Sequence, residues 1–462
     1  ELRAEGLDRV VLCGMGGSSL APEVITRSYG VPLEILDSTN PSAVSRALSA
    51  DLQRTVVVVS SKSGSTLETD SQRRSFQSAF EAAGIEAAAR FVVVTDEGSE
   101  LEKLARDQAY RRVFLADSRV GGRYSALTAF GLVPSGLAGA DIAELLDSAD
   151  EVSGDLANDG PDNPGLVLAA ALAGNPGRDK VVIASAGSGI VGFADWAEQL
   201  IAESTGKQGR GVLPVALEGV DAPEIGRPAD DVAVALLVAD PTASIDTAGK
   251  PAVLVGGALG AQLLAWETAT AAAGRLLGIN PFDQPDVESA KQAARGLLDA
   301  QPRPAPPDVV DNGLELRGSP GLLDDVDTAA AGVEALLGKL GGDGYVAVMA
   351  YLDPVRDARL GDVRASLARR TGRPVTFGWG PRFLHSTGQY HKGGPAQGVF
   401  LQITSTEPVD VEIPDRPFTF GSLIAAQAAG DAAVLADQGR PVLRLHVADP
   451  TVGVAALAEL LS

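Results

Sequence analysis

A run of hydroxyl groups stands out at residues 60–66, which read SSKSGST and place five hydroxyls and one ammonium group within seven residues. The run follows a β-rich segment, so it is predicted to lead from a strand into a helix. Hydroxyls and the free N–H groups at a helix N-terminus donate hydrogen bonds to anions, and the helix dipole favours negative charge there. One serine would suffice to cap such a helix. Five hydroxyls instead indicate a loop that binds a phosphate dianion.

A second turn, residues 14–19 (GMGGSS), also follows a predicted strand. Its glycines allow backbone N–H groups to approach a ligand, although such a turn is more often a tight connection between a strand and a helix. It is not a dinucleotide fingerprint, because Ser19 occupies the last position of G-x-G-x-x-G. Gly206-Lys207 is not a P-loop, because Ile201 stands where that motif needs glycine. The sequence therefore implies no nucleotide.

Acid–base chemistry could come from Glu203, near the end of a helix that is predicted to begin near Val191. Gln199 stands four residues earlier, on the same face of that helix. A glutamate at a helix end beside a glycine could take a proton from carbon, but a solvated surface glutamate is the commoner case. Lys291 ends the segment 280–291, in which an Asn-Pro turn precedes a helix, and taken alone it reads as an exposed lysine.

Two of the three histidines, His385 and His391, lie in the glycine-flanked segment 384–394. Paired histidines suggest zinc. The single cysteine, Cys13, is distant in the sequence and no H-E-x-x-H motif occurs, so we expect no metal. His446 lies in an apolar strand and is predicted to be structural.

The composition restricts the classes of partner. Lys and Arg total 38 against 60 Asp and Glu residues, which gives a formal charge of -22. Nonspecific binding to nucleic acid or to an anionic membrane is therefore not expected, and an anionic ligand must be held locally. No apolar run reaches the length of a membrane span. Because one cysteine cannot form an intrachain disulfide and no basic, apolar leader opens the chain, we expect a cytoplasmic protein.

The elements that must position these groups follow a repeating pattern. In the first third of the chain, β-rich runs alternate with small-residue loops and longer helical segments, which is typical of a parallel α/β sheet. These runs are residues 9–12, 55–59 and 90–95.

Two breaks divide the chain. A stretch rich in Gly, Pro, Asp and Asn at 154–165 precedes a second unit of the same kind, and four prolines within 301–307 cannot continue a helix. A chain of 462 residues is too long for one ordinary core. The predicted domains are residues 1–153, 165–300 and 308–462.

Five segments together resemble glucose-6-phosphate isomerases. They are residues 14–19, 61–66, 121–125 (GGRYS), 198–207 and 280–291. The last three are specific to that family, whereas Gly/Ser loops are common to all sugar-isomerase-type domains. The resemblance covers most of residues 7–300. It implies two sugar-isomerase (SIS-type) α/β/α sandwich domains with parallel sheets, to which the predicted strands add a C-terminal α/β segment.

The resemblance also implies an activity, the isomerisation of glucose 6-phosphate and fructose 6-phosphate through a cis-enediol, without a cofactor. Glu203 matches the base that moves a proton between C1 and C2, and Gln199 matches a glutamine of the same site. Arg123 matches the arginine that stabilises the enediolate, and Lys291 matches a lysine assigned to ring opening. The residues that match or adjoin the family's phosphate loop are Ser18, Ser61, Lys62, Ser63 and Thr66.

One feature departs from the family. Its members carry the ring-opening histidine between the catalytic glutamate and lysine, whereas residues 204–290 contain no histidine here. The segment 384–394 is similar to the family's L-H-S-x-G-Q-Y segment. We infer that this segment has been relocated beyond Lys291, as in actinobacterial or transaldolase-fused forms. His385 then takes the ring-opening role, with His391 as second choice.

Other functions stay open at this point. A phosphosugar-binding regulatory protein would keep loop 61–66 and lose the catalytic groups, yet Glu203, Arg123 and Lys291 are all present. Additional activity on mannose 6-phosphate is compatible with the sequence, because the two sugars differ in one hydroxyl orientation. The resemblance suggests a homodimer, and the chain could be half of a bifunctional protein with a transaldolase.

Overall fold

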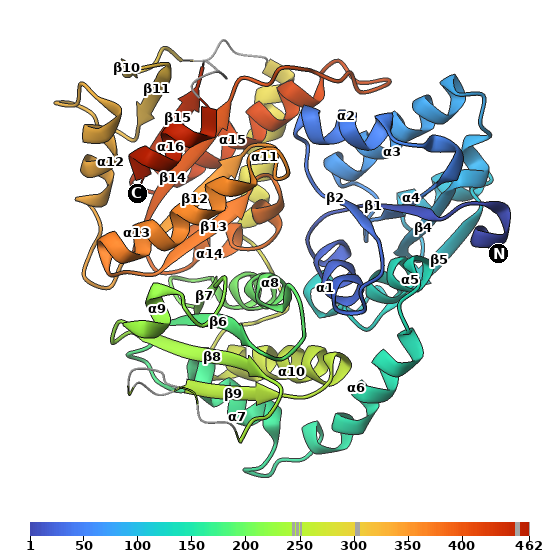
Figure 1. The fold of residues 1–462 in the computed structure, drawn as a ribbon, viewed down its shortest axis with the longest axis horizontal. Coiled ribbons are helices and arrows are strands. Elements are labelled where there is room, and N and C mark those ends of the chain that lie inside the picture. Colours follow the sequence, from blue (N-terminus) through green and yellow to red (C-terminus); the bar gives the residue numbers. More distant parts are fainter. Residues whose placement is uncertain (243–244, 246–248, 250–251, 301–304, 449–452, 462) are drawn as a thin grey trace.

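The described part of the chain forms three β-sheets, each covered by helices (Figure 1). The structure, a computed structural model, describes residues 1–242, 245, 249, 252–300, 305–448 and 453–461. The expected α/β class is confirmed: the first two sheets are fully parallel. We refer to the three sheets with their covering helices as the first, second and third units.

The first sheet has the strand order β2-β1-β3-β4-β5. Its central strands are runs of buried valine, as expected for parallel strands covered on both faces. Helices α2, α3 and α4 pack on one face and α5 on the other. The strands are β1 (Arg9–Gly14), β2 (Glu34–Leu36), β3 (Thr55–Ser60), β4 (Phe91–Asp96) and β5 (Arg112–Ala116). The helices are α1 (Leu20–Ser28), α2 (Pro41–Ser49), α3 (Leu67–Ala82), α4 (Glu100–Asp107) and α5 (Ala129–Ala138).

The order of strands in the first sheet reverses at β1: β2 lies on one side of β1, and β3 to β5 lie on the other side. The connection after β1 leads to one side of the sheet and the connection after β2 returns to the other. Ligands of open parallel sheets bind outside the carboxyl ends of the strands at such a switch point. The turn 14–19 and the loop 60–66 stand side by side there, because Gly14 and Ser60 are register partners.

The second sheet has the order β7-β6-β8-β9 and is covered by a long helix, α10, which packs on α6, α7 and α8. The strands are β6 (Lys180–Ala186), β7 (Leu213–Ala216), β8 (Val232–Val238) and β9 (Ala252–Gly256). The helices are α6 (Ile142–Leu156), α7 (Pro164–Ala173), α8 (Phe193–Thr205), α9 (Pro223–Gly226) and α10 (Leu259–Leu277). Because α6 packs on α10, this helix belongs to the second unit, although most of its residues lie before residue 153.

The third sheet, which sequence patterns showed only as a C-terminal α/β segment, has six strands in the order β10-β11-β15-β14-β12-β13. Strands β12 to β15 are parallel, and the β10–β11 hairpin adds antiparallel at the edge. The strands are β10 (Val309–Asp311), β11 (Leu314–Gly318), β12 (Tyr345–Tyr351), β13 (Val375–Trp379), β14 (Gly398–Ser405) and β15 (Val442–Val447).

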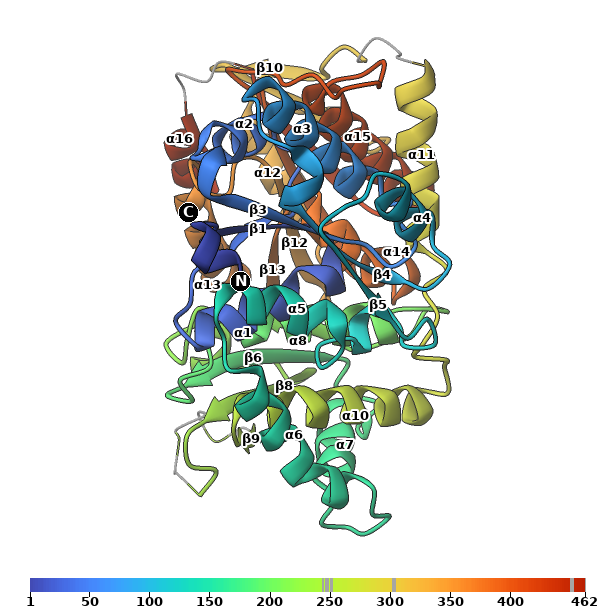
Figure 2. The same cartoon turned by 90° about the vertical axis from the view of Figure 1, so that its right-hand side faces the viewer.

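Helices α12, α13 and α16 pack on one face of the third sheet and α15 on the other. Helix α11, although it follows the second unit in the chain, packs along α15 (Figure 2). The helices are α11 (Val287–Ala300), α12 (Ala329–Leu337), α13 (Val363–Thr371), α14 (Gly388–Gly393), α15 (Phe420–Asp437) and α16 (Gly453–Leu461). Short 3-10 turns are η1 (Leu2–Glu5), η2 (Gly16–Ser18), η3 (Leu52–Arg54), η4 (Ala87–Arg90), η5 (Gly122–Tyr124), η6 (Ala358–Asp362) and η7 (Arg382–His385).

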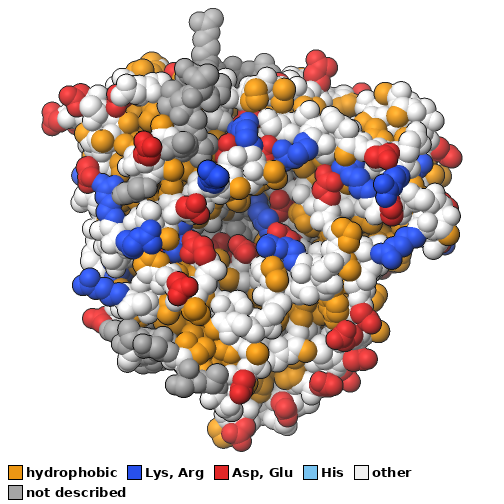
Figure 3. Space-filling view, viewed as in Figure 1, with side chains coloured by type: hydrophobic (Ala, Val, Ile, Leu, Met, Phe, Trp, Pro, Cys, Tyr) orange, Lys and Arg blue, Asp and Glu red, His pale blue; other side chains and the backbone are white. Residues whose placement is uncertain are grey.

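The three units meet around α8, which contacts α1 of the first unit and α14 of the third. Figure 3 shows a hollow in this face of the molecule where the units meet, with both basic and acidic side chains around it. Among the described helices, none combines the length and the apolar character needed to cross a membrane.

Candidate active site

The turn after β1 packs tightly against three other segments of the site. A Cβ added to Gly17 would lie 2.1 Å from the carbonyl oxygen of Gly122, so the turn lies directly on η5. Gly16 has a φ of +58°, which favours glycine, and a Cβ there would lie 2.7 Å from Nε2 of Gln199 and 3.0 Å from the carbonyl oxygen of His385. The glycines of this turn therefore permit the close approach of η5, α8 and η7.

Glu203 is buried, with 6% of its surface exposed, in the last turn of α8. Its Oε1 atom lies 3.5 Å from Nη1 of Arg123, and its Oε2 accepts a hydrogen bond of 3.2 Å from Nε2 of Gln199. The same amide nitrogen donates to the backbone oxygen of His385 at 2.6 Å. The i,i+4 spacing on α8 thus places Gln199 between the carboxylate and the η7 segment.

Arg123 is buried at 4% exposure, and its guanidinium is fixed from several directions. It donates to Oγ of Ser204 at 3.0 Å and to the backbone oxygen of Pro281 at 3.0 Å, and it also bonds the side chain of Gln284. A cation held by neutral acceptors and one carboxylate keeps a fixed position, which suits a group that must meet developing negative charge.

A second buried cation, Lys207, stabilises the turn that follows α10. Its Nζ donates to the backbone oxygen of Asn280 at 2.7 Å and to the carboxylate of Asp283 at 2.6 Å. Burial lowers the pKa of Lys207, because desolvation disfavours the charged ammonium. Lys207, just after α8, and Arg123, in η5, therefore bond the same turn, residues 280–284.

The hydroxyl-rich loop precedes the N-terminus of α3. Oγ of Ser61 lies 3.2 Å from Oγ1 of Thr66 and accepts from the backbone N–H of Gly64 at 3.2 Å, so the loop curls around its own centre. The hydroxyls of Ser63 and Ser65 are 2.8 Å apart and exposed. The loop therefore presents several hydroxyls beside a helix N-terminus, which is an anion-binding arrangement.

His385 lies next to this loop, because its ring contacts a carboxylate at the start of the helix that follows the loop. Its Nε2 lies 3.1 Å from Oε1 of Glu68, in the first turn of α3, and the same oxygen accepts a bond of 2.7 Å from Nε2 of Gln427 on α15. A carboxylate on one ring nitrogen fixes the tautomer and orientation of a histidine. The side chain of His385 is 14% exposed, so the ring remains accessible.

The segment that carries His385 docks on the end of α8. A Cβ on Gly206 would lie 2.4 Å from Cα of Tyr390, so α14 passes directly over this glycine. Nε2 of Gln389 donates to the backbone oxygen of Gly206 at 2.8 Å and to the carboxylate of Asp286 at 2.6 Å. Segment 384–394, which belongs to the third unit, thus reaches the same place as Glu203 and the turn 280–286.

Comparison with known proteins gives the family. A family model described as phosphoglucose isomerase matches residues 3–208. A probable glucose-6-phosphate isomerase of Haloquadratum walsbyi is 30% identical over 341 residues, which cover 63% of this chain and 79% of that protein. The chain belongs to the phosphoglucose isomerase family.

Other relatives match shorter stretches. A glucose-6-phosphate isomerase of Citrifermentans bemidjiense is 36% identical over 213 residues, which cover 43% of this chain and 40% of that protein. Among solved structures, a hypothetical protein from Thermus thermophilus has a TM-score of 0.57 at 26% identity and covers 64% of this chain and 85% of its own. A glucose-6-phosphate isomerase from Chlamydia trachomatis has a TM-score of 0.55 at 22% identity, covers 65% of this chain and 71% of its own, and shows the shared fold.

His391, the second choice for the histidine of a phosphoglucose isomerase site, is buried in the core of the third unit at 2% exposure. Its ring stacks on Tyr345, and its Nδ1 lies 3.0 Å from the phenolic oxygen. Desolvation holds the pKa of His391 well below its usual value, with smaller contributions from the charges of Lys392 and Arg440. His391 is therefore a neutral packing residue, and the structure brings His385 alone of the two to the site.

Three further predicted site residues have distinct surroundings. Lys62 donates to the carboxylate of Asp96 at 2.5 Å and to the backbone oxygen of Ser118 at 2.8 Å, so two of the three donors of its ammonium are already used within the chain. Ser18 is half-buried in η2, beside the hydroxyl loop. Lys291 lies in α11, and its side chain is outside the described residues.

The residues that orient the predicted site residues were not predicted from the sequence. Glu68 had a signal, an acidic residue in the first helical turn after the hydroxyl loop. Gln427 had none, because it comes from α15 and meets Glu68 across 359 positions of the chain. Ser204 and Gln284, which hold Arg123, stood inside segments that the resemblance covered. Among the described residues, no group of three or more His, Cys, Asp or Glu side chains is placed to hold a metal ion.

Proposed function

We propose that this chain catalyses the reversible isomerisation of glucose 6-phosphate and fructose 6-phosphate. The observation that carries the proposal is the buried pair of Glu203 and Arg123, 3.5 Å apart, at the junction that also holds the His385–Glu68 pair and the hydroxyl loop. A base, a fixed cation, a histidine and an anion-binding loop at one place meet the needs of an aldose–ketose isomerase acting on a phosphorylated sugar.

In this proposal Glu203 is the base. The C2 proton of the open-chain aldose is acidic because of the neighbouring carbonyl, and a positioned carboxylate can remove it to form a cis-enediol. Return of the proton to C1 gives the ketose. The hydrogen bond from Gln199 holds the carboxylate in one orientation, so the same oxygen serves both carbons.

Arg123 then stabilises the negative charge that develops on the enediolate oxygen. Its guanidinium needs no reorganisation at the moment of reaction, because Ser204 and Pro281 already fix it. Fixed charges in a buried site are commonly the largest catalytic contribution.

His385 is proposed to assist the opening of the cyclic sugar. Ring opening moves a proton between a ring oxygen and a hydroxyl, and histidine performs such transfers near neutral pH. Glu68 orients its ring as a positioning residue. Ser61, Ser63 and Thr66 are proposed to bind the phosphate with Ser18 nearby, Lys62 adds positive charge to this loop, and Lys291 is kept as a second ring-opening group.

Two alternative functions make different demands on these groups. A purely phosphosugar-binding regulatory protein would not need a buried carboxylate beside a fixed arginine. Formation of mannose 6-phosphate differs from formation of glucose 6-phosphate only in which face of C2 receives the proton, so the same groups could support this additional activity.

A coupled assay tests the proposal, with fructose 6-phosphate supplied, glucose 6-phosphate detected and a chelator present. We expect the wild type to turn over and Glu203→Gln to lose about 10³-fold or more of that rate while still binding the phosphosugar. Glu151→Gln, at an exposed position of α6, is the matched control and should match the wild type. Near-normal turnover by Glu203→Gln would end the assignment of the base, and no turnover by the wild type would refute the enzyme.

A homodimer, an origin in a longer chain with a transaldolase, and a cytoplasmic location are likewise proposals that rest on the family resemblance and on composition. Analytical ultracentrifugation of the purified chain measures the first. The complete reading frame decides the second.

A further inference from the structure

A cavity of about 760 Å³ lies in the third unit, between the face of its sheet and the helices α11 and α15. This volume is in the range of small-molecule sites. The walls from the helices are mainly apolar and consist of alanines of α15 together with Leu297, Leu298 and Ile424. None of the residues proposed for the isomerase site is among the described residues that line it.

The floor of the cavity is polar, which is unusual for a sheet face under helices. Two adjacent rows of side chains run across the strands on this face. One row joins the register partners Arg317, Arg444 and Gln402 on β11, β15 and β14. The next row joins Glu315, His446, Thr404 and Tyr351.

The first row places two arginines directly opposite each other. Like charges at paired positions of neighbouring strands repel and destabilise the sheet. Arg317 has a counter-charge, because its Nη2 lies 2.9 Å from a carboxylate oxygen of Glu315. Arg444 donates to the neutral side chain of Gln402 at 2.9 Å and forms no ion pair with a carboxylate in the described part of the chain. Burial and the charge of Arg317 lower the pKa of Arg444.

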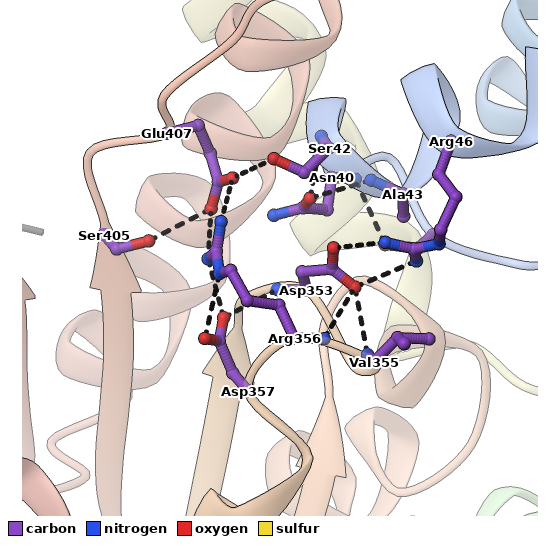
Figure 4. Close-up of polar contacts among 11 residues, drawn as sticks. Asn40, Ser42, Ala43, Arg46, Asp353, Val355, Arg356, Asp357, Ser405 and Glu407 are labelled. Carbon is purple, nitrogen blue, oxygen red and sulfur yellow. Dashed lines mark hydrogen bonds and ion pairs between the residues drawn. The ribbon is translucent and has the colours of Figure 1, made fainter. Parts of the chain in front are cut away.

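The remaining ionisable groups of the cavity do not neutralise Arg444. The carboxylate of Glu407 is occupied by Arg356 at 2.9 Å and by the hydroxyls of Ser42 and Ser405 (Figure 4). His446 lies between two threonine hydroxyls, and desolvation lowers its pKa. Within the described residues that line the cavity, Arg444 is therefore a partly buried cation without a counter-charge.

A second polar group, in the wall of the same cavity, lacks a hydrogen-bond partner in the described part of the chain. The phenolic oxygen of Tyr351, a residue that is 3% exposed and lines the cavity, has no hydrogen-bond partner among the described residues. A buried hydroxyl without a partner costs free energy, and such groups are rare in native proteins. A ligand that accepts from Tyr351 and neutralises Arg444 would satisfy both groups.

We propose that this cavity is a second ligand site, which binds a small organic anion. Its single carboxylate or phosphate group would pair with Arg444 and accept from Tyr351, and its apolar body would lie against α11 and α15. Inorganic phosphate alone would leave most of the volume unfilled, so an apolar body should add affinity.

Binding calorimetry tests the site with two anionic probes, 3-phenylpropanoate and phenyl phosphate, and with the neutral 3-phenylpropan-1-ol. Each titration is done in saturating fructose 6-phosphate, so that the isomerase site is occupied. We expect at least one anion to bind with a Kd of roughly 1 mM or below and the alcohol to bind at least about tenfold more weakly. Which anion binds distinguishes a carboxylate ligand from a phosphate ester.

Three variants assign the binding. Arg444→Met should weaken the binding of the anion at least about tenfold, and Tyr351→Phe, which removes a hydroxyl that bonds no described residue, at least about threefold. Arg359→Met, at an exposed arginine that does not line the cavity, should bind as the wild type does. If Arg444→Met folds poorly, Tyr351→Phe decides alone.

The proposal is overturned if neither anion binds the wild type at 10 mM, roughly ten times the expected Kd. It is equally overturned if the alcohol binds as tightly as the anions, if the Arg444 and Tyr351 variants bind unchanged, or if a repeat titration shows that the anion binds only when fructose 6-phosphate is left out. These results are independent of the coupled assay, so the second site and the proposed isomerase can fail separately.

Discussion

The chemistry of a single residue here depends on its nearest partners. The three histidines illustrate this: His385 is held by the carboxylate of Glu68 at the edge of the site, His391 is buried against a tyrosine, and His446 lies between threonine hydroxyls. Their side chains are identical, and only the first lies beside the groups of the proposed isomerase.

His385→Ala should lower turnover of the cyclic sugar by about 10²-fold, because ring opening loses its proton-transfer group. Turnover of the open-chain form, measured in the same coupled assay with freshly generated substrate, should fall much less. Glu68→Gln should give a smaller loss in the same direction, because the amide keeps the ring in place without the charge. Equal losses on both forms of the sugar would remove His385 from ring opening.

His391 makes a prediction about stability and pH. Its folded-state pKa lies well below 6.5, so below about pH 6.5 the unfolded chain binds a proton that the folded chain does not. The free energy of unfolding should therefore decrease as the pH falls, by up to about 1.4 kcal/mol per pH unit from this group. Denaturant titrations at several pH values between 5 and 7 give the free energy of unfolding at each pH. This free energy should change less steeply with pH for His391→Gln than for the wild type. Identical slopes would contradict the buried neutral histidine.

At the scale of elements, glycines on two turns determine how η2, in the turn after β1, packs on η5. The turn after β1 has no room for a side chain at Gly17, whereas a Cβ on Gly122, on the other side of the same contact, meets no described atom within 4 Å. The contact is thus asymmetric. Position 17, in the turn after β1, has to be glycine, whereas position 122 in η5 has room for a methyl group.

Gly17→Ala should therefore displace η5 and with it Arg123, and lower turnover by about 10²-fold, the usual effect of a misplacement near 1 Å. Gly122→Ala is the matched control and should retain turnover within a fewfold. The coupled assay measures both. If the two variants behave alike, the close packing of η2 on η5 is not what positions Arg123.

At the scale of the whole molecule, ion pairs join the third unit to the other two. Arg46 of α2 pairs with the nearly buried Asp353 at 2.7 Å, among the polar contacts drawn in Figure 4. Arg364 of α13 joins the second unit by bonding Glu218 at 2.6 Å and the buried Glu224. The third unit holds the His385 segment in place, so these contacts bear on the site.

Arg364→Met should lower the free energy of unfolding by about 3–5 kcal/mol, because Glu224 is left buried without its cation. Arg369→Met, on the same helix but exposed and bonded only to Ser366 among the described residues, is the control and should change the stability by less than about 0.5 kcal/mol. Melting curves of both variants check this. A loss below about 1 kcal/mol for Arg364→Met would show that water or another group replaces the cation.

The sequence by itself determined the local elements and the types of the reactive groups. Valine runs predicted the parallel strands, the hydroxyl run marked the loop before α3, and helical spacing put Gln199 and Glu203 on one face. These features depend on neighbours within a few residues, so periodicity and propensity suffice to predict them.

Only the tertiary structure decided which of these groups meet. His385 pairs with Glu68 across 317 positions, Lys62 turns to Asp96, and Tyr351 and Arg444 share a cavity that no local pattern marked. Such contacts depend on how three sheets pack around α8 and α15, and that packing is set by side chains spread over the whole chain. A short sequence window contains no information about it, because the partner lies outside the window.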